Sequence, residues 1–128
     1  MNREEFIAYL DHYNAGSWDA VCQWYTDDIV FESFGHRMAG PAVRDFLLRL
    51  HQGMRDHLAV RTLLIDRSHA ALEADVRIEA LSDLPNLPAG PMHKGEIVST
   101  RMFIFYDIVD GKFSHIRVAG WPPARIRA

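Results

Sequence analysis

The chain of 128 residues has a single cysteine, no long apolar run and no excess of basic charge. Because a disulfide needs two cysteines, Cys22 leaves the chain without an internal disulfide, and nothing in the sequence requires an oxidising compartment. No run approaches the roughly 18 apolar residues that a transmembrane helix needs, so no membrane partner is expected. The formal net charge of −3 argues against nucleic acid as a partner, since nucleic-acid-binding proteins usually carry a basic surface.

Signals for export and for metal or phosphate binding are also missing. The charged start Met1–Glu5 leads into no apolar segment, so no signal peptide is expected. None of the seven histidines has the HExxH spacing of a metal site, and no glycine-rich phosphate loop is visible, so we expect no metal and no cofactor. We expect a soluble, cytoplasmic protein that forms a single domain over residues 1–128.

Apolar residues first recur with helical spacing and then alternate as in strands, which predicts three helices and five strands. The first helix is expected between an Asn2 cap and Gly16, the second after Ser17, and the third from Pro41. The strands are expected over residues 29–34, 58–65, 70–81, 96–109 and 112–119, and residues 35–40 are expected to turn away from the first strand. Asp110 and Gly111 form the typical turn of a hairpin.

This order of elements predicts an α+β fold, in which three N-terminal helices pack on one face of a curved, mostly antiparallel sheet. A curved sheet wrapped around helices leaves a cone with an apolar interior. Such an interior is a common site for a small hydrophobic ligand. We expect its wall to include the residues Trp24, Phe34, Phe46, Leu50, Met54, Met102 and Trp121.

Glu32 stands among apolar residues in the first predicted strand. A carboxylate taken out of water is costly unless it is paired, hydrogen-bonded or protonated. Glu32 shares strand parity with Val30 and Phe34, so it should point where they point. If that face is the interior of the cone, Glu32 is placed to act as a general base. The alternative is a carboxylate at the rim that pairs with Arg37 or Arg61.

Three stretches of the sequence resemble the nuclear transport factor 2-like superfamily, and within it the SnoaL-like and ketosteroid-isomerase-like branch. They are YLDHYNAGSWDAVCQWYTDDIVFESFG at residues 9–35, AGPAVRDFLLRL at 39–50 and FYDIVDGKFSHIRVAGW at 105–121. The resemblance implies the cone-shaped α+β barrel and a homodimer formed through the outer face of the sheet. As a guide to function it is broad, because the superfamily includes isomerases, dehydratases, cyclases, hydrolases and non-catalytic binders.

The resemblance to ketosteroid isomerase assigns roles to two residues. It implies that Tyr9 donates a hydrogen bond to a substrate oxyanion and that Glu32 is the general base. The second oxyanion donor of that enzyme, a protonated acid, would fall near Met102, which is not acidic. The alternative for Tyr9, and for Tyr13 one helical turn later, is a core aromatic whose hydroxyl bonds to a backbone carbonyl or to water.

The resemblance to scytalone-dehydratase-like enzymes implies roles for Tyr13 and His57 instead. His57 precedes an apolar strand and would be a second acid or base, or simply a residue that caps the strand. Asn14 stands where that family has an aspartate. The limonene-epoxide-hydrolase pattern needs aspartates on the last two strands, and the central parts of those strands have none.

These observations lead to two functional hypotheses. The first is a cofactor-independent lyase or isomerase that acts on a hydrophobic cyclic or carbonyl compound, in which Glu32 moves a proton and Tyr9 or Tyr13 steadies the resulting enolate. The second is a non-catalytic module for ligand binding or dimerisation that keeps the cone without the chemistry.

Overall fold

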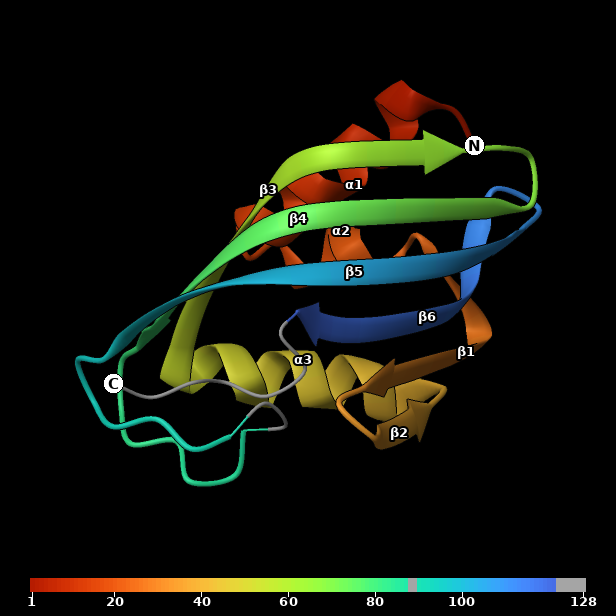
Figure 1. Cartoon of the computed structure of the whole chain (residues 1–128). Helices are drawn as coiled ribbons and strands as arrows, with labels where there is room; N and C mark the ends of the chain where they lie inside the picture. The colour runs from red at the N-terminus through yellow and green to blue at the C-terminus, as the bar shows by residue number, and fades with distance from the viewer. Residues whose placement is uncertain (88–89, 122–128) are drawn as a thin grey trace.

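A computed structural model of the chain describes residues 1–87 and 90–121. The elements follow in the order α1 (Arg3–Asn14), α2 (Trp18–Cys22), β1 (Tyr25–Ser33), β2 (His36–Ala39), α3 (Pro41–Gly53), β3 (Met54–Ile65), β4 (His69–Ala80), β5 (Ile97–Val109) and β6 (Lys112–Trp121). The strands form one sheet in the order β2-β1-β6-β5-β4-β3, antiparallel throughout except between β1 and β6. The sheet is curved and unclosed, and the helices pack on its concave side (Figure 1). The predicted α+β cone is confirmed.

The first helix begins as the sequence predicts. The side chain of Asn2 accepts a hydrogen bond from the backbone N–H of Glu5 at 2.8 Å, and the Glu5 carboxylate accepts one from the Asn2 N–H at 3.1 Å. This reciprocal pair satisfies two donors that the first turn of a helix leaves open. Helix α1 then buries Phe6, Tyr9 and Leu10 against the concave face of the sheet.

The other end of α1 is fixed to β3 by Asn14. Its side-chain amide donates to the Leu58 carbonyl at 2.9 Å, and its side-chain oxygen accepts from the Leu58 N–H at 2.9 Å. The pair of bonds imitates a step of a β-ladder, so a helix end and a strand are held in register. As a consequence, Tyr13 on α1 and Asp56 on β3 come together.

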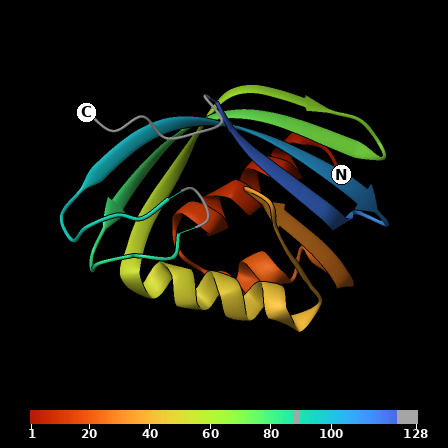
Figure 2. The same cartoon turned by 60° about the horizontal axis from the view of Figure 1, so that its bottom comes forward.

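The sheet shows the alternation expected of a half-buried antiparallel sheet. On β4 the alternate residues from Ala70 to Ala80 are buried, and the charged residues between them point away from the core. Strands β3, β4 and β5 bend over α1, and α3 lies across the side of the cone opposite them (Figure 2). Within the described residues, no helix has the length and apolarity that a membrane span requires.

One predicted connection is wrong. Residues 35–40 do not simply turn away, because His36–Ala39 pair with β1 as the strand β2. Phe34 and Gly35 form a two-residue hairpin turn, with φ angles of 50° and 82°. A phenylalanine is not a typical residue for such a turn, so the sequence carried no hairpin signal there.

Candidate functional site

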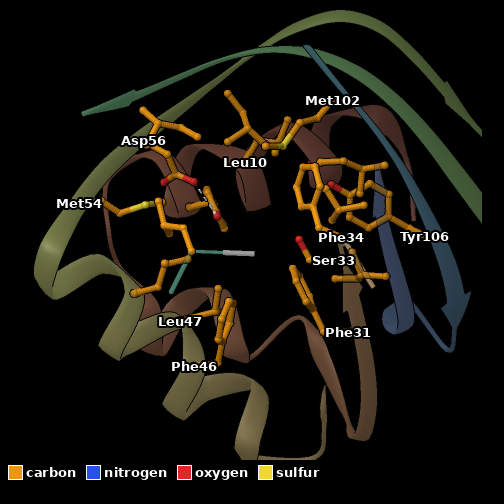
Figure 3. A pocket seen from close by; sticks show the side chains of 18 of the residues that line it. Leu10, Phe31, Ser33, Phe34, Phe46, Leu47, Met54, Asp56, Met102 and Tyr106 are labelled. Carbon is orange, nitrogen blue, oxygen red and sulfur yellow. Dashed lines mark hydrogen bonds between the residues drawn. The ribbon is translucent and has the colours of Figure 1, made fainter. Parts of the chain in front are cut away.

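The concave face of the sheet, α1 and α3 line a partly open cavity of about 90 Å³. A cavity of roughly 10 to 15 Å³ holds one buried water, so this cavity has room for several waters or a small organic ring. Most of the wall is apolar, with side chains from α1, α3 and five of the strands. The polar residues that line it are Tyr9, Tyr13, Ser33, Asp56 and Tyr106. Figure 3 shows Asp56 and Ser33 directed into this space from β3 and β1.

Asp56 is the one carboxylate among the residues that line the described cavity. It lies between Met54 and Leu58 on the inward parity of β3, and its side chain is 9% exposed. Its Oδ2 accepts a hydrogen bond from the Tyr13 hydroxyl at 3.0 Å, and its Oδ1 lies 2.8 Å from Nε2 of His51. A carboxylate buried to this extent requires such partners.

His51 lies in the last turn of α3, and its side chain contacts the Asp56 carboxylate. The ring is 8% exposed and lies against Trp18, with ring centroids 4.1 Å apart. Its Nδ1 is 2.7 Å from the backbone carbonyl of Leu47, four residues earlier in the helix. Because a carbonyl can only accept, Nδ1 carries a hydrogen in this arrangement.

The contact between His51 and Asp56 must therefore contain a proton. With Nδ1 already protonated, Nε2 of a neutral imidazole is an acceptor, and an ionised carboxylate is also only an acceptor. A 2.8 Å contact between two acceptors would be repulsive, so the proton lies on Nε2 or on Oδ1. The pair is either imidazolium with carboxylate or imidazole with carboxylic acid.

The tyrosines near the cavity are held in the neutral form. Burial, and then the nearby Asp56 charge, raise the pKa of the Tyr13 phenol well above its ordinary value of 10.0. Burial likewise raises the pKa of Tyr9, whose hydroxyl shares a 2.8 Å hydrogen bond with that of Tyr25. Both phenols are thus donors or acceptors of hydrogen bonds, and neither is an anion near neutral pH.

Ser33 provides a hydroxyl on the opposite side of the cavity from Asp56 (Figure 3). It is the inward residue at the end of β1 and is 9% exposed. Among the described residues the Ser33 hydroxyl has no hydrogen-bond partner, and its oxygen is not one of the fully enclosed atoms that lack a partner. The hydroxyl therefore faces the open space and is free to bond to a ligand.

Seven of the predicted site residues line the cavity: Tyr9, Tyr13, Phe34, Phe46, Leu50, Met54 and Met102. The structure brings these residues together as expected from the sequence. Their predicted roles, including the oxyanion role of Tyr9 or Tyr13, stay predictions.

The predicted placement of Glu32 in the interior is wrong. The inward residues of β1 are Ile29, Phe31 and Ser33, so Glu32 points to the outer face, where its side chain is 39% exposed. Its Oε2 lies 2.6 Å from Nε2 of His115, which is a different partner from the two arginines considered as alternatives. Glu32 does not reach the cavity that the other predicted residues line.

Three more predicted residues lie elsewhere. His57 follows Asp56 directly, so strand alternation turns it to the exposed face of β3. Trp121, at the end of β6, is 60% exposed on that same outer face. Trp24 packs edge-on against the Tyr9 ring, with centroids 6.4 Å apart, outside the cavity wall.

The sequence reasoning missed Asp56, His51 and Ser33 as site residues. A signal for Asp56 exists, because it occupies an apolar parity between Met54 and Leu58, but the strand was expected to begin only at residue 58. Within the described residues, no group of three or more histidine, cysteine or acidic side chains is arranged to hold a metal. The polar groups of the cavity suit proton transfer and hydrogen bonding.

Comparison with known proteins confirms the predicted resemblance. The family model described as SnoaL-like domain matches residues 6–116. A search among curated proteins found no match.

Solved structures give the same fold. A protein from Pseudomonas putida KT2440, provisionally named a polyketide cyclase, is 25% identical, with a TM-score of 0.80 over 90% of this chain and 87% of its own. A SnoaL-like polyketide cyclase from Agrobacterium tumefaciens C58 is 20% identical, with a TM-score of 0.75 over 94% and 92%. An LEH-like epoxide hydrolase from Mycobacterium tuberculosis is 16% identical, with a TM-score of 0.73 over 91% and 80%. The latter two likenesses concern the fold alone.

Proposed function

Because the chain belongs to the SnoaL-like family, we propose that it is a cofactor-independent lyase or isomerase that transfers a proton on a hydrophobic ring compound bearing a carbonyl group. The observation that carries this proposal is the buried set Tyr13–Asp56–His51 at the wall of an apolar cavity. The names of the related structures, which include polyketide cyclases, agree with ring compounds as ligands.

In this proposal Asp56 is the catalytic acid or base, in place of Glu32. It removes a proton from the carbon next to the ligand carbonyl, in the form of the pair in which His51 holds the positive charge. His51 is a positioning residue, since its Nδ1–H donates to the Leu47 carbonyl, which fixes the orientation of the ring, and its Nε2–H donates to the Asp56 carboxylate and orients it. Return of the proton to another carbon gives an isomer, and its transfer to a departing hydroxyl gives a dehydrated product and water.

The enolate formed by proton removal needs a hydrogen-bond donor. The Ser33 hydroxyl is suited to this task, because it faces the cavity and has no other partner among the described residues. A donor already in place where charge develops lowers the barrier without reorganisation. A ligand that fills the apolar cavity displaces water from it, and this strengthens the hydrogen bond to the developing negative charge.

The proposal is tested by hydrogen–deuterium exchange on a simple ring ketone. We would follow the carbon-bound protons next to the carbonyl of 2-tetralone by NMR in deuterated buffer, with wild type, Asp56→Asn and Glu32→Gln. Wild type should accelerate exchange above the buffer background. Asp56→Asn should lose at least roughly 100-fold of that acceleration, as is typical for removal of a general base. Glu32→Gln is the matched control outside the cavity and should keep it.

Exchange no faster than the background with wild-type protein, for 2-tetralone and for larger ring ketones, would contradict the proposal. Equal loss in Glu32→Gln and Asp56→Asn would contradict the assignment of Asp56. Circular dichroism of each variant shows whether the fold is retained.

A non-catalytic ligand-binding module is the second candidate. It is favoured by the commitment of both tyrosine hydroxyls, since Tyr9 bonds to Tyr25 and Tyr13 bonds to Asp56. Fewer groups are then free to stabilise an enolate than in the enzyme that the sequence suggested. Binding of 2-tetralone without exchange of its protons would favour this candidate.

We further propose a homodimer formed through the outer face of the sheet. Leu64, Phe103 and Phe105 are exposed there by 67%, 46% and 42%. Exposed apolar side chains that gather on one face are typical of protein interfaces. Light scattering coupled to size-exclusion chromatography should give the mass of a dimer, and Phe103→Asp should give that of a monomer. A monomeric wild type would contradict the proposal.

The cytoplasmic location stays a prediction.

A further inference from the structure

Two hairpins of this protein have the same backbone turn but very different residues in it. In the turn between β5 and β6, Asp110 and Gly111 have φ angles of 51° and 74°. In the turn between β1 and β2, Phe34 and Gly35 have φ angles of 50° and 82°. Two-residue turns with positive φ at both positions favour asparagine or aspartate followed by glycine. Asp110 fits this preference, whereas Phe34 does not.

A phenylalanine is strained in this conformation. In the left-handed region the Cβ of an L-residue crowds the backbone, and bulky side chains are outliers there. Such a residue persists only where the rest of the structure or the function requires it.

Packing within the protein does not account for Phe34. Its side chain is only half-buried, and it belongs neither to the buried core nor to the partly buried apolar side chains that pack on the core. Phe31 and Phe46 form a ring pair, but Phe34 takes part in none among the described residues. The fold therefore gains little from an aromatic ring at this position.

The ring of Phe34 does, however, form part of the cavity wall. Phe34 has the strand parity of Glu32, which points to the outer face, so continued extended backbone would carry its ring outside as well. The left-handed turn brings the ring into the wall of the cavity instead, on the same side as Ser33 and Tyr106 (Figure 3). Because the residue is half-buried at the tip of a hairpin, its ring lies where the cavity meets solvent.

We propose that Phe34 is a specificity-determining residue, which contacts the bound ligand and selects flat, aromatic or conjugated rings that place an oxygen at the Ser33 hydroxyl. An aromatic ring favours a flat partner through stacked or edge-on contacts. The inference rests on the proposed function, since it requires that the cavity binds a ring compound.

The test compares Phe34→Asn with the matched control Asp110→Phe. We would measure the urea unfolding midpoint of each protein, and its binding of 2-naphthol by the fluorescence of that compound. 2-Naphthol is the flat analogue of the enol of 2-tetralone. Saturated 2-decalol, followed by its competition with 2-naphthol, serves as the non-planar probe.

Phe34→Asn should raise the urea midpoint by about 0.5 M, because asparagine relieves the strain of the turn. It should also weaken 2-naphthol binding by roughly tenfold or more, and should bring the affinities for 2-naphthol and 2-decalol closer together. Asp110→Phe should lower the midpoint by a similar amount and leave 2-naphthol binding unchanged, since that turn lies away from the cavity.

Four results would overturn the inference. A lower midpoint for Phe34→Asn would mean that the ring serves folding, and an unchanged midpoint for Asp110→Phe would remove the premise of strain. Unchanged 2-naphthol binding in Phe34→Asn, with binding by wild type, would refute the inference while the proposed function stands. If wild type itself binds neither 2-naphthol nor 2-tetralone, the proposed function fails and this inference fails with it.

Discussion

His51–Asp56 and His115–Glu32 are both pairs of a histidine and a carboxylate, and they lie in two different surroundings. The first pair is 8% and 9% exposed and lies at the wall of the cavity, with Tyr13 and the Leu47 carbonyl as further partners. The second pair is 27% and 39% exposed and lies on the outer face of the sheet. The distances between the paired atoms are similar, at 2.8 and 2.6 Å. The distance between two groups therefore says little about what they do.

The two pairs differ in how well water can solvate them. On the outer face, water solvates either partner if the other is lost, so the pair contributes little. In the interior, loss of one partner leaves the other as a buried polar group that water does not solvate, and this is costly. Changes to the interior groups should therefore have large effects, and changes on the outer face small ones.

The largest effect should come from alkaline pH, because all four tyrosines of the chain are interior groups with a raised pKa. Burial is the first cause in each, so the folded state favours the neutral phenol while the unfolded chain ionises near pH 10. The free energy of unfolding should be constant below that pH and fall above it, by about 1.4 kcal/mol per pH unit for each phenol and so roughly 5.5 kcal/mol per unit for four.

Urea unfolding at several pH values between about 8 and 11.5 measures this decrease in the free energy of unfolding. The absorbance of tyrosinate at 295 nm should appear together with unfolding, as followed by circular dichroism. Tyrosinate that forms with a midpoint near pH 10 in the folded protein would show that the phenols are accessible to solvent, and the description of the interior would be wrong.

The next effect is the loss of a partner in the interior pair. Asp56→Ala removes the acceptor of the Tyr13 hydroxyl and the partner of His51, so it should lower the free energy of unfolding by roughly 3 to 5 kcal/mol. Glu32→Ala, the same truncation on the outer face, should cost less than about 1 kcal/mol. Urea unfolding at pH 7 measures both, and similar values for the two variants would remove the contrast.

The fold was largely predictable because its signals are local. The alternation over residues 70–80, the cap at Asn2 and the turn at Asp110 each specify their element with neighbouring residues alone. Strand β2 was not predictable, because the turn before it contains Phe34, a residue that such turns rarely accept.

The site was predictable only in its apolar part. Strand β1 has apolar residues on both parities, so the alternation could not show that Phe31 points inward and Glu32 outward. His51 and Asp56 meet only because α3 ends and β3 begins between them, and the Asn14 side chain fixes where that strand lies against α1. Such a meeting depends on three elements at once, and a sequence pattern describes one element at a time.

A smaller effect should follow from Tyr13→Phe, which keeps the ring and removes one donor from the Asp56 carboxylate. We expect a loss of about 1.5 to 3 kcal/mol in the free energy of unfolding, as for a hydrogen bond to a charged group. Proton exchange on 2-tetralone should fall but not vanish, since His51 still orients Asp56. If the variant equals wild type in both measurements, the Tyr13 hydroxyl has no part in holding the carboxylate.

The smallest effect should be that of Glu32→Gln, the residue that the sequence alone favours as the base. Glutamine keeps the shape and still accepts a hydrogen bond from His115, so the change removes only the charge of a half-exposed pair. We expect less than about 0.5 kcal/mol in the free energy of unfolding and less than roughly threefold in the exchange of 2-tetralone protons.

A 100-fold loss of that exchange, with the fold intact by circular dichroism, would instead assign the role of base to Glu32. Glu32 would then reach the ligand in a conformation in which β1 exposes its other face to the cavity. A one-residue change in the register of β1 would exchange the two faces of the strand, and would also break its present pairing with β2 and β6. Because so many backbone bonds would have to re-form, the small effect is the expected one, and its measurement decides which of the two carboxylates is the base.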